Sequence, residues 1–399
     1  MDDKHLVQQV FDWVQKKIDR YGPRLAGDQA SLDAADEIYQ EIEGFADHLG
    51  KDDFHIHQGA FLGWIRILVA SYLASTIFLW LNLPMISVVL TISAILILVI
   101  QFFLYLPLLD KLYPKRLSRN VYGVIEPKDN IKQQVILSGH HDSAHVFNFF
   151  IHQPKLYNLR TTGSIGIVIL LLLISIILAV FHPHEMLRFI LSSVASLGFI
   201  WVGQMWFFTS KKASPGAGDN LVASAIAMTL GKHYASLKAS GNGLKHTRIL
   251  MVSFDAEEEG LRGARAFARA HKKMLHDVPT FMINMDCLYD EKELFFLTSD
   301  LNNFVKLDQN LAESLHQTAN ALGLATKTQP LAFLTGGTDA AELAKIGIRA
   351  TTMIGMPWTN QTRSHVYHTP QDTLDHVNPQ VVIDTIHIID QWIQKTDKN

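Results

Sequence analysis

The feature that most constrains this chain is a run of 43 residues, from Ile67 to Leu109, without a single Asp, Glu, Lys or Arg. A helix that crosses a membrane needs about 20 apolar residues, so the run is long enough for two crossings. Asn82-Leu83-Pro84 interrupts it near the middle, where it predicts a tight turn between antiparallel helices. The run therefore predicts a transmembrane hairpin.

A second pair of apolar segments follows, at Thr161–His184 and Phe189–Ser210, with a break at His182-Pro183-His184-Glu185. The alternative is a set of buried helices in a large water-soluble core. Uncharged Leu- and Ile-rich runs of this length favour the membrane instead. The sequence thus predicts two hairpins, four transmembrane helices, and an integral multi-pass protein in contact with the lipid bilayer.

Basic residues flank the open ends of both hairpins, whereas the two turns contain only Arg188. The flanking residues are Arg66, Lys111, Lys115, Arg116, Arg119, Arg160, Lys211 and Lys212. Because Lys and Arg accumulate on the cytoplasmic side of membrane proteins, we expect the polar segments to lie in the cytoplasm. The net charge of −3 shows no basic surplus, so nothing argues for a nucleic-acid partner.

The polar segments 1–60, 110–160 and 211–399 read as one domain that hairpins 61–109 and 161–210 interrupt. Short, continuously apolar runs predict strands buried on both faces, and helical patterns alternate with them. We expect strands at residues 134–138, 248–254, 280–285 and 349–355, and helices at 31–45, 220–239, 262–275, 304–322, 339–345 and 379–395. This alternation predicts an α/β sandwich around a mostly parallel sheet.

Acidic residues or histidine end three of the predicted strands, and two more candidates sit in turns. These are His140 with Asp142, Glu257 with Glu258, and Asp286 at strand ends, and Asp219 and His368 in turns. Taken singly, an Asp at a strand end usually caps a helix and a lone His usually has a structural role. Together they supply hard or borderline ligands without a thiolate, which suits a pair of divalent ions. Zinc is expected, with manganese or cobalt as alternatives.

The single cysteine, Cys287, excludes an intramolecular disulfide framework and a cysteine-rich zinc module. Nineteen histidines leave an imidazole-and-carboxylate metal site open.

Several motifs occur in an order that resembles one family. They are Tyr21-Gly-Pro-Arg-Leu-Ala-Gly, His140-x-Asp142, Gly-Ala-x-Asp-Asn around Asp219, Glu-Glu-x-Gly-Leu-x-Gly from Glu257, Asp286, and Tyr-His-Thr-Pro around His368. The chain resembles metallopeptidase family 28, which includes two-zinc aminopeptidases and glutaminyl cyclases. Gly337-Thr-Asp is similar to the family's Ser-Asp-His turn, with Ala340 where His is usual. The resemblance implies a zinc-exopeptidase-like α/β/α sandwich that carries the two hairpins as insertions.

The resemblance also implies residue roles. His140 and Asp286 would hold one zinc ion, Glu258 and His368 the other, and Asp219 would bridge the two. Asp142 would orient His140. Glu257 would act as general base. Tyr367 would donate its hydroxyl to the developing oxyanion, with ordinary packing as its alternative role.

Four neighbouring residues are expected to be bystanders. His141 alternates away from the ligand face, and Glu259 would solvate the start of the following helix. Asp255 would be a local hydrogen-bond acceptor, and Cys287 a small buried side chain. The second hairpin separates His140 from Asp219, which is a departure from the family's pattern.

These features predict a membrane-anchored zinc aminopeptidase that removes N-terminal residues from peptide substrates. A glutaminyl cyclase-like acyltransferase is one alternative, although that branch of the family uses a single zinc ion. A catalytically inactive relative acting as a membrane scaffold is another. Substrate preference and oligomeric state stay open.

Overall fold

The computed structural model describes residues 2–359 and 365–398. It forms two compact units. The first comprises Met1–Gln58, Pro114–His145 and Lys212–Asn399, and the second comprises Gly59–Tyr113 and Val146–Lys211. The second unit extends beyond the predicted hairpin segment 161–210 because Phe147 and Phe149 pack on Phe208 within it.

Within the described residues, the first unit contains a nine-stranded sheet with four parallel strands at its centre. The central strands, in spatial order, are β6 (Thr247–Phe254), β3 (Gln133–His140), β7 (Thr280–Leu288) and β11 (Arg349–Gly355). At one side lie antiparallel β2 (Lys115–Ile125) and β1 (His48–His57). At the other lie β8 (Leu294–Asp300), β9 (Val305–Lys306) and β10 (Lys327–Pro330). The predicted α/β fold with a mostly parallel sheet is confirmed.

The central strands are buried along nearly their whole length, as their continuous apolar runs predict. β3 pairs in parallel with both β6 and β7, and this register places His140 level with Phe254. The carboxyl ends of the three strands therefore meet at one edge of the sheet, which is where ligands collect in folds of this kind.

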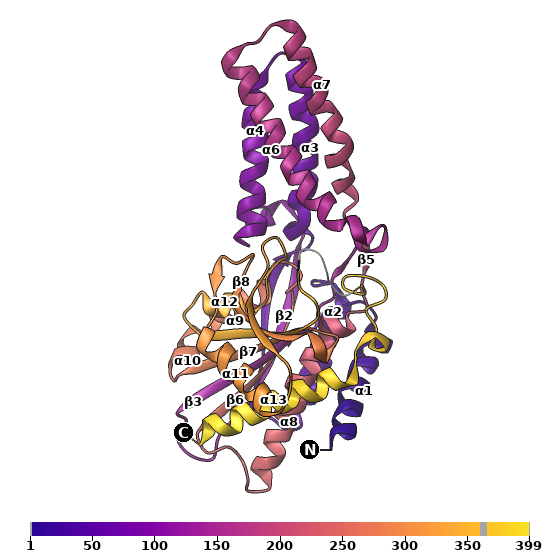
Figure 1. Ribbon diagram of the computed structural model, residues 1–399. Helices are drawn as coiled ribbons and strands as arrows, with labels where there is room; N and C mark the ends of the chain where they lie inside the picture. The colour runs from indigo at the N-terminus through magenta and orange to yellow at the C-terminus, as the bar shows by residue number, and fades with distance from the viewer. Residues whose placement is uncertain (1, 360–364, 399) are drawn as a thin grey trace. The chain divides into compact units, whose positions relative to one another are not determined.

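Helices cover both faces of this sheet (Figure 1). They are α1 (Asp3–Tyr21), α2 (Gln29–Glu43), α8 (Val222–Ala239), α9 (Arg262–Ala270), α10 (Lys272–His276), α11 (Gln309–Ala321), α12 (Ala340–Ala344) and α13 (Pro379–Asp397). α8 packs against β3, β6 and β7, and α1 and α13 pack against α8. α9 packs against α12.

Two predicted helices differ from the structure. The expected helix 262–275 is broken at His271, which separates α9 from α10. The helix expected from residue 304 begins instead at Gln309, because Val305 and Lys306 pair with β8 as the short strand β9.

The second unit contains four helices long and apolar enough to cross a membrane. They are α3 (Ala60–Trp80), α4 (Pro84–Leu98, continued by a π-helical turn to Phe103), α6 (Tyr157–Phe181) and α7 (Glu185–Val202). A short α5 (Asn148–Ile151) precedes α6, and β4 (His145–Phe147) pairs with β5 (Thr209–Ala213). Both predicted turns lie where Asn82 and Pro183 were expected to place them. Arg66, expected to flank the first hairpin, lies inside α3.

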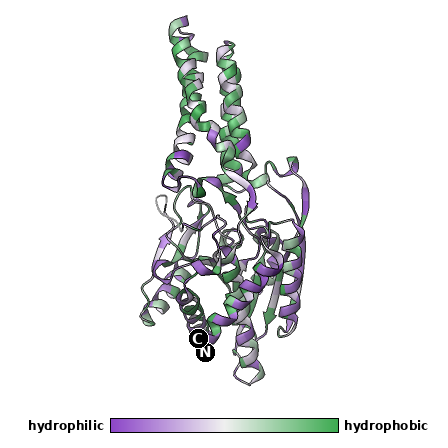
Figure 2. Ribbon diagram, turned by 90° about the vertical axis from the view of Figure 1, so that its right-hand side faces the viewer, coloured by the Kyte–Doolittle hydropathy of each residue, from purple (hydrophilic) through white to green (hydrophobic). Residues whose placement is uncertain are grey.

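Hydrophobic residues colour these helices green in Figure 2, and many of their Leu and Ile side chains are exposed, including Ile77, Leu173 and Ile200. Several small polar side chains, including Ser87 and Ser175, instead lie buried inside the unit. Ser87 Oγ lies 2.7 Å from Ser175 Oγ, which links α4 to α6. An apolar exterior with hydrogen-bonded serines inside is typical of helices packed in lipid.

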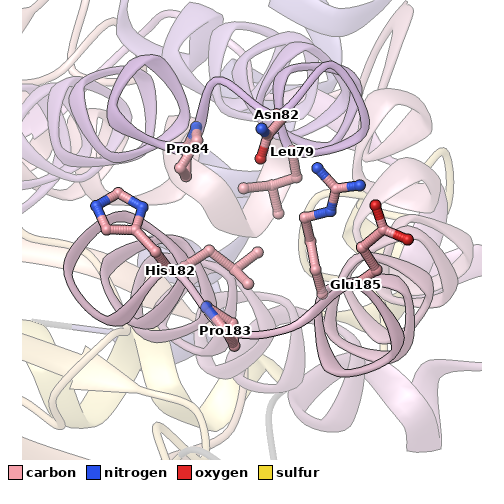
Figure 3. Close-up of a pocket in the computed structure, with 8 residues that line it drawn as sticks. Leu79, Asn82, Pro84, His182, Pro183 and Glu185 are labelled. Atoms are coloured by element: carbon pink, nitrogen blue, oxygen red, sulfur yellow. The ribbon is translucent and has the colours of Figure 1, made fainter.

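A pocket lies where the two hairpins turn (Figure 3). Its lining residues are Leu79, Asn82, Pro84, Leu178, His182, Pro183, Glu185 and Arg188. This set contains none of the residues that the sequence predicts as metal ligands, so the pocket is separate from the candidate site.

If all four helices cross the membrane, both ends of the chain lie on the same side. In a Cys287→Ser background, cysteines placed at exposed Gln15 and exposed Lys395 should react with an impermeant maleimide from the same face. A cysteine at Asn82, in the first turn, should react from the opposite face. Opposite accessibility of the two ends would mean that a helix does not cross.

Candidate metal centre

The elements of the first unit bring all five predicted metal ligands to one place. His140 ends β3, Glu258 follows β6, Asp286 lies near the end of β7, Asp219 lies in the turn Ala217–Leu221 before α8, and His368 precedes α13. Four of the five residues are at most 5% exposed, and Glu258 is slightly more exposed.

His140, Asp219 and Asp286 form a first group, in which one ligand atom from each residue lies within 4.8 Å of the others. His140 Nε2 lies 3.3 Å from Asp219 Oδ1 and 4.0 Å from Asp286 Oδ1. One imidazole and two carboxylates thus point at a common centre.

Asp219, Glu258 and His368 form a second group of the same kind. His368 Nε2 lies 3.2 Å from Asp219 Oδ2 and 3.3 Å from Glu258 Oε1. The two oxygens of Asp219 therefore face different histidines, one in each group. A carboxylate shared in this way is the geometry that holds two metal ions close together.

Glu257 lies beside both groups. Its Oε2 is 3.9 Å from His140 Nε2, and it forms a third close group with His140 and Glu258. Burial raises the pKa of Glu257 well above its ordinary value, and the neighbouring Glu258 adds to this effect. A carboxyl group with a raised pKa is suited to accept and release a proton near neutral pH.

Asp142 connects two of the strand ends. Its carboxylate lies 3.3 Å from His140 Nδ1 and accepts hydrogen bonds from the backbone N–H groups of Glu257 and Glu258, at 3.2 and 3.1 Å. Asp142, which is predicted to orient His140, thus also holds the backbone of both glutamates in place. Burial opposes protonation of His140, but the nearby carboxylates of Asp142 and Asp219 raise its pKa well above the ordinary value.

The donor set fits a divalent metal such as zinc. His140 Nε2 and Asp219 Oδ2 are buried and make no hydrogen bond within the described residues. A buried polar atom without a partner is costly, so its presence at the centre of a ligand group points to a cation. Two imidazoles and three carboxylates without a thiolate suit zinc, manganese or cobalt.

The ring of Tyr367 is buried and packs on its neighbours. Its centroid lies 3.9 Å from that of His368 and 5.9 Å from that of Trp358. These contacts place Tyr367 at the second histidine, while its role as an oxyanion donor stays a prediction.

The predicted bystanders have varied surroundings. His141 Nδ1 lies 2.9 Å from Ser253 Oγ, and burial lowers the pKa of His141 to about 3. Asp255 accepts hydrogen bonds from Ser31 Oγ and from the Arg119 and Ala256 N–H groups, as expected of a structural acceptor. Cys287 is buried. Glu259 is also buried, and its expected role at the start of the following helix stays a prediction.

Sequence reasoning did not single out three buried charged residues near the site: Arg24, Asp339 and Asp372. All three lie in or next to motifs that carry the family resemblance, which was the available signal. Neither carboxylate oxygen of Asp339 has a hydrogen-bond partner among the described residues, and burial raises its pKa well above the ordinary value. Asp372 accepts a hydrogen bond from the Gly218 N–H at 2.9 Å.

Solved structures define the class of fold. The chain is similar to a Zn-dependent exopeptidase from Parabacteroides distasonis (12% identity, 97% of each chain covered, TM-score 0.57). It is also similar to a glutaminyl cyclase from Bacteroides thetaiotaomicron (11%, 97% of each chain, 0.57) and to a zinc aminopeptidase from Bacillus subtilis (14%, 98% of this chain and 95% of that one, 0.57). The fold is that of the zinc exopeptidases.

A sequence comparison matches one family over part of the chain. Residues 205–393 match the model of Peptidase family M28, so the predicted resemblance to metallopeptidase family 28 is confirmed. The matched segment includes Asp219, Glu257, Glu258, Asp286 and His368. No curated protein matches the chain.

The approach of β3 to α8 next to His140 leaves no room for a side chain at Gly139. A Cβ there would lie 2.6 Å from both Ala223 Cβ and Ser224 N. We expect Gly139→Ala to lower the free energy of unfolding by about 1–3 kcal/mol and to weaken zinc binding, because α8 and His140 must shift. Gly44→Ala, where the nearest atom is 3.6 Å away, is the control. Thermal unfolding and zinc titration measure both effects, and equal effects of the two substitutions would contradict this packing.

Proposed function

We propose that the protein is a membrane-anchored, zinc-dependent aminopeptidase that hydrolyses the N-terminal peptide bond of its substrates. The observation that carries this proposal is the sharing of Asp219 between two His-and-carboxylate groups, with Glu257 beside both. The match to Peptidase family M28 supports the hydrolase chemistry. Four apolar helices and the basic residues at their open ends support a membrane anchor with the catalytic unit in the cytoplasm.

His140 and Asp286 would hold one zinc ion, Glu258 and His368 the other, and Asp219 both. When bound, such a pair activates a water molecule and polarises the peptide carbonyl. Glu257 takes the proton from the attacking water and passes it to the departing amine. Asp142 keeps His140 and both glutamates in place through the contacts described above. Tyr367 would donate its hydroxyl to the oxyanion that develops at the carbonyl.

A glutaminyl cyclase-like acyltransferase is the second candidate function, because solved glutaminyl cyclases share the fold. The resemblance associates that activity with a single zinc ion, whereas the ligands of two positions are present here. The complete pair of ligand groups therefore favours the aminopeptidase. It also disfavours an inactive scaffold, which would be expected to lack a ligand or the base.

The purified protein should contain close to two zinc ions per chain, and its zinc affinity should rise with pH. Burial raises the pKa of Asp286 to about 7, so below that pH zinc must displace a proton from this carboxyl group. We expect the affinity to fall about tenfold per pH unit for each displaced proton, from His140, whose pKa is also raised, and below pH 7 from Asp286 as well. Competition titrations with a chelator at several pH values measure this. One tightly held ion would favour the cyclase, and none would exclude both enzymes.

Glu257→Gln should abolish peptide hydrolysis while leaving the zinc content nearly unchanged. Glutamine has almost the same shape but accepts no proton, and a positioned general base contributes about 10²–10⁴-fold in rate. The loss should fall mainly on kcat.

The matched variant is Glu258→Gln, which should instead deplete one zinc ion, because Glu258 lies 3.3 Å from His368 Nε2 in the second ligand group. Metal analysis and assays with aminoacyl substrates compare the two. If Glu257→Gln lost zinc and Glu258→Gln kept it, the two roles would be reversed. Full activity in both variants would place the site elsewhere.

A further inference from the structure

The segment Val146–Lys211 separates two residues that must act at one point. His140 lies just before this segment and Asp219 just after it. The chain must therefore return to the same edge of the sheet, with Asp219 next to His140. The hydrogen bond from the Ser214 N–H to the Ala144 carbonyl, at 2.9 Å, joins the two flanking segments.

Arg24 joins the same two segments through its side chain. Its Nε donates to the His141 carbonyl at 2.8 Å, and its Nη2 donates to the Pro215 carbonyl at 2.9 Å and to the Gly216 carbonyl at 3.4 Å. One planar group thus contacts the residue after His140 and the turn that leads into Asp219. The rigid fork of the guanidinium fixes both the distance and the direction between them.

The backbone of Arg24 strengthens this link. Its N–H donates to Ser143 Oγ at 3.0 Å, and its carbonyl accepts from the Ser143 N–H at 2.9 Å. The arginine is therefore held against the β3 end independently of its side chain. Its guanidinium then reaches from this fixed position to Pro215 and Gly216.

Arg24 is wholly buried, and its four guanidinium hydrogen bonds within the described residues all go to main-chain carbonyls. Burial lowers its pKa to about 10, with Asp142 and Asp372 acting in the opposite direction, so the group is charged at neutral pH. A buried cation without a direct carboxylate partner is costly. The hydrogen bonds that the guanidinium donates to both segments, at His141 and at Pro215 and Gly216, account for the presence of this buried cation.

A separate contact links Asp219 to the second histidine. Asp372, four residues after His368, accepts from the Gly218 N–H at 2.9 Å and from the Asp219 N–H at 3.3 Å. The two ligand groups therefore depend on different side chains. Arg24 relates Asp219 to His140, and Asp372 relates Asp219 to His368.

We propose that Arg24 is a positioning residue that sets the spacing between His140 and Asp219, and thereby the affinity of the metal position formed by His140, Asp219 and Asp286. This inference rests on the proposed two-metal site. It assigns Arg24 to one position only. The position formed by Asp219, Glu258 and His368 depends on Asp372 instead.

Zinc titration of the full-length protein tests this in two backgrounds. Glu258→Gln weakens the second position, and Asp286→Asn weakens the first. Arg24→Met should lower the zinc affinity about 10–100-fold in the Glu258→Gln background, the range typical for residues that orient ligands. In the Asp286→Asn background the change should be less than about threefold. Arg24→Lys, which keeps the charge but not the fork, should give a smaller loss with the same preference.

Lys17→Met is the matched control, because Lys17 is also a fully buried cation and pairs with Glu41 at 2.8 Å. It should leave both zinc affinities unchanged. Thermal unfolding identifies any variant that does not fold. If Arg24→Met does not fold, the zinc affinities of Arg24→Lys are compared between the two backgrounds instead. Equal losses in both backgrounds, or no loss in either, would overturn the positioning role. If the unsubstituted protein bound no zinc, the proposed function would fall and this inference with it.

Discussion

Asp219 places a negative charge, only 2% exposed, between two histidines that belong to distant parts of the sequence. Burial alone would raise its pKa, but the adjacent imidazoles of His140 and His368 lower it below the ordinary value. A buried carboxylate persists only where cations or donors surround it. The strand ends, the turn before α8 and the segment before α13 together place the two histidines around the buried Asp219 carboxylate.

The parallel register of β3, β6 and β7 brings the carboxyl ends of the three strands to one edge of the sheet. This register alone places His140, Asp286 and Glu258 at that edge. The insertion between His140 and Asp219 adds a second condition, because the chain must return from the inserted segment to the same side of the membrane. A segment that leaves a domain into a membrane must cross an even number of times to return to the same side. If α6 and α7, which are long and apolar enough to cross a membrane, both cross it, this condition is met, and the membrane prediction is then compatible with the predicted site.

The sequence predicted what depends on local patterns. The four central strands are continuous apolar runs, and the turns at Asn82 and Pro183 follow from residues that end helices. The ligands were found through motifs whose order resembles a family. The other strands, β1, β2, β4, β5, β8, β9 and β10, were not predicted. Of these, β1 and β10 are largely polar and pair at the sheet margins, so no apolar run marks them. The break at His271, between α9 and α10, has no glycine or proline to mark it.

Arg24 and Asp372 were missed for a different reason. Their partners include backbone groups far away in the sequence, such as the Pro215 carbonyl and the Gly218 N–H. Backbone partners leave no pattern of residue types from which a contact can be inferred. The motifs around Arg24 and Asp372 could have drawn attention to these residues, but only the tertiary structure shows which groups they contact.

The central claim is that two metal ions share Asp219. Anomalous diffraction at the zinc edge, from crystals of the full chain grown with zinc, measures this most directly. The account predicts two peaks about 3.5–4 Å apart, one on each side of the Asp219 carboxylate. A single peak beside Glu258 and His368, with the His140 group empty at saturating zinc, would contradict it.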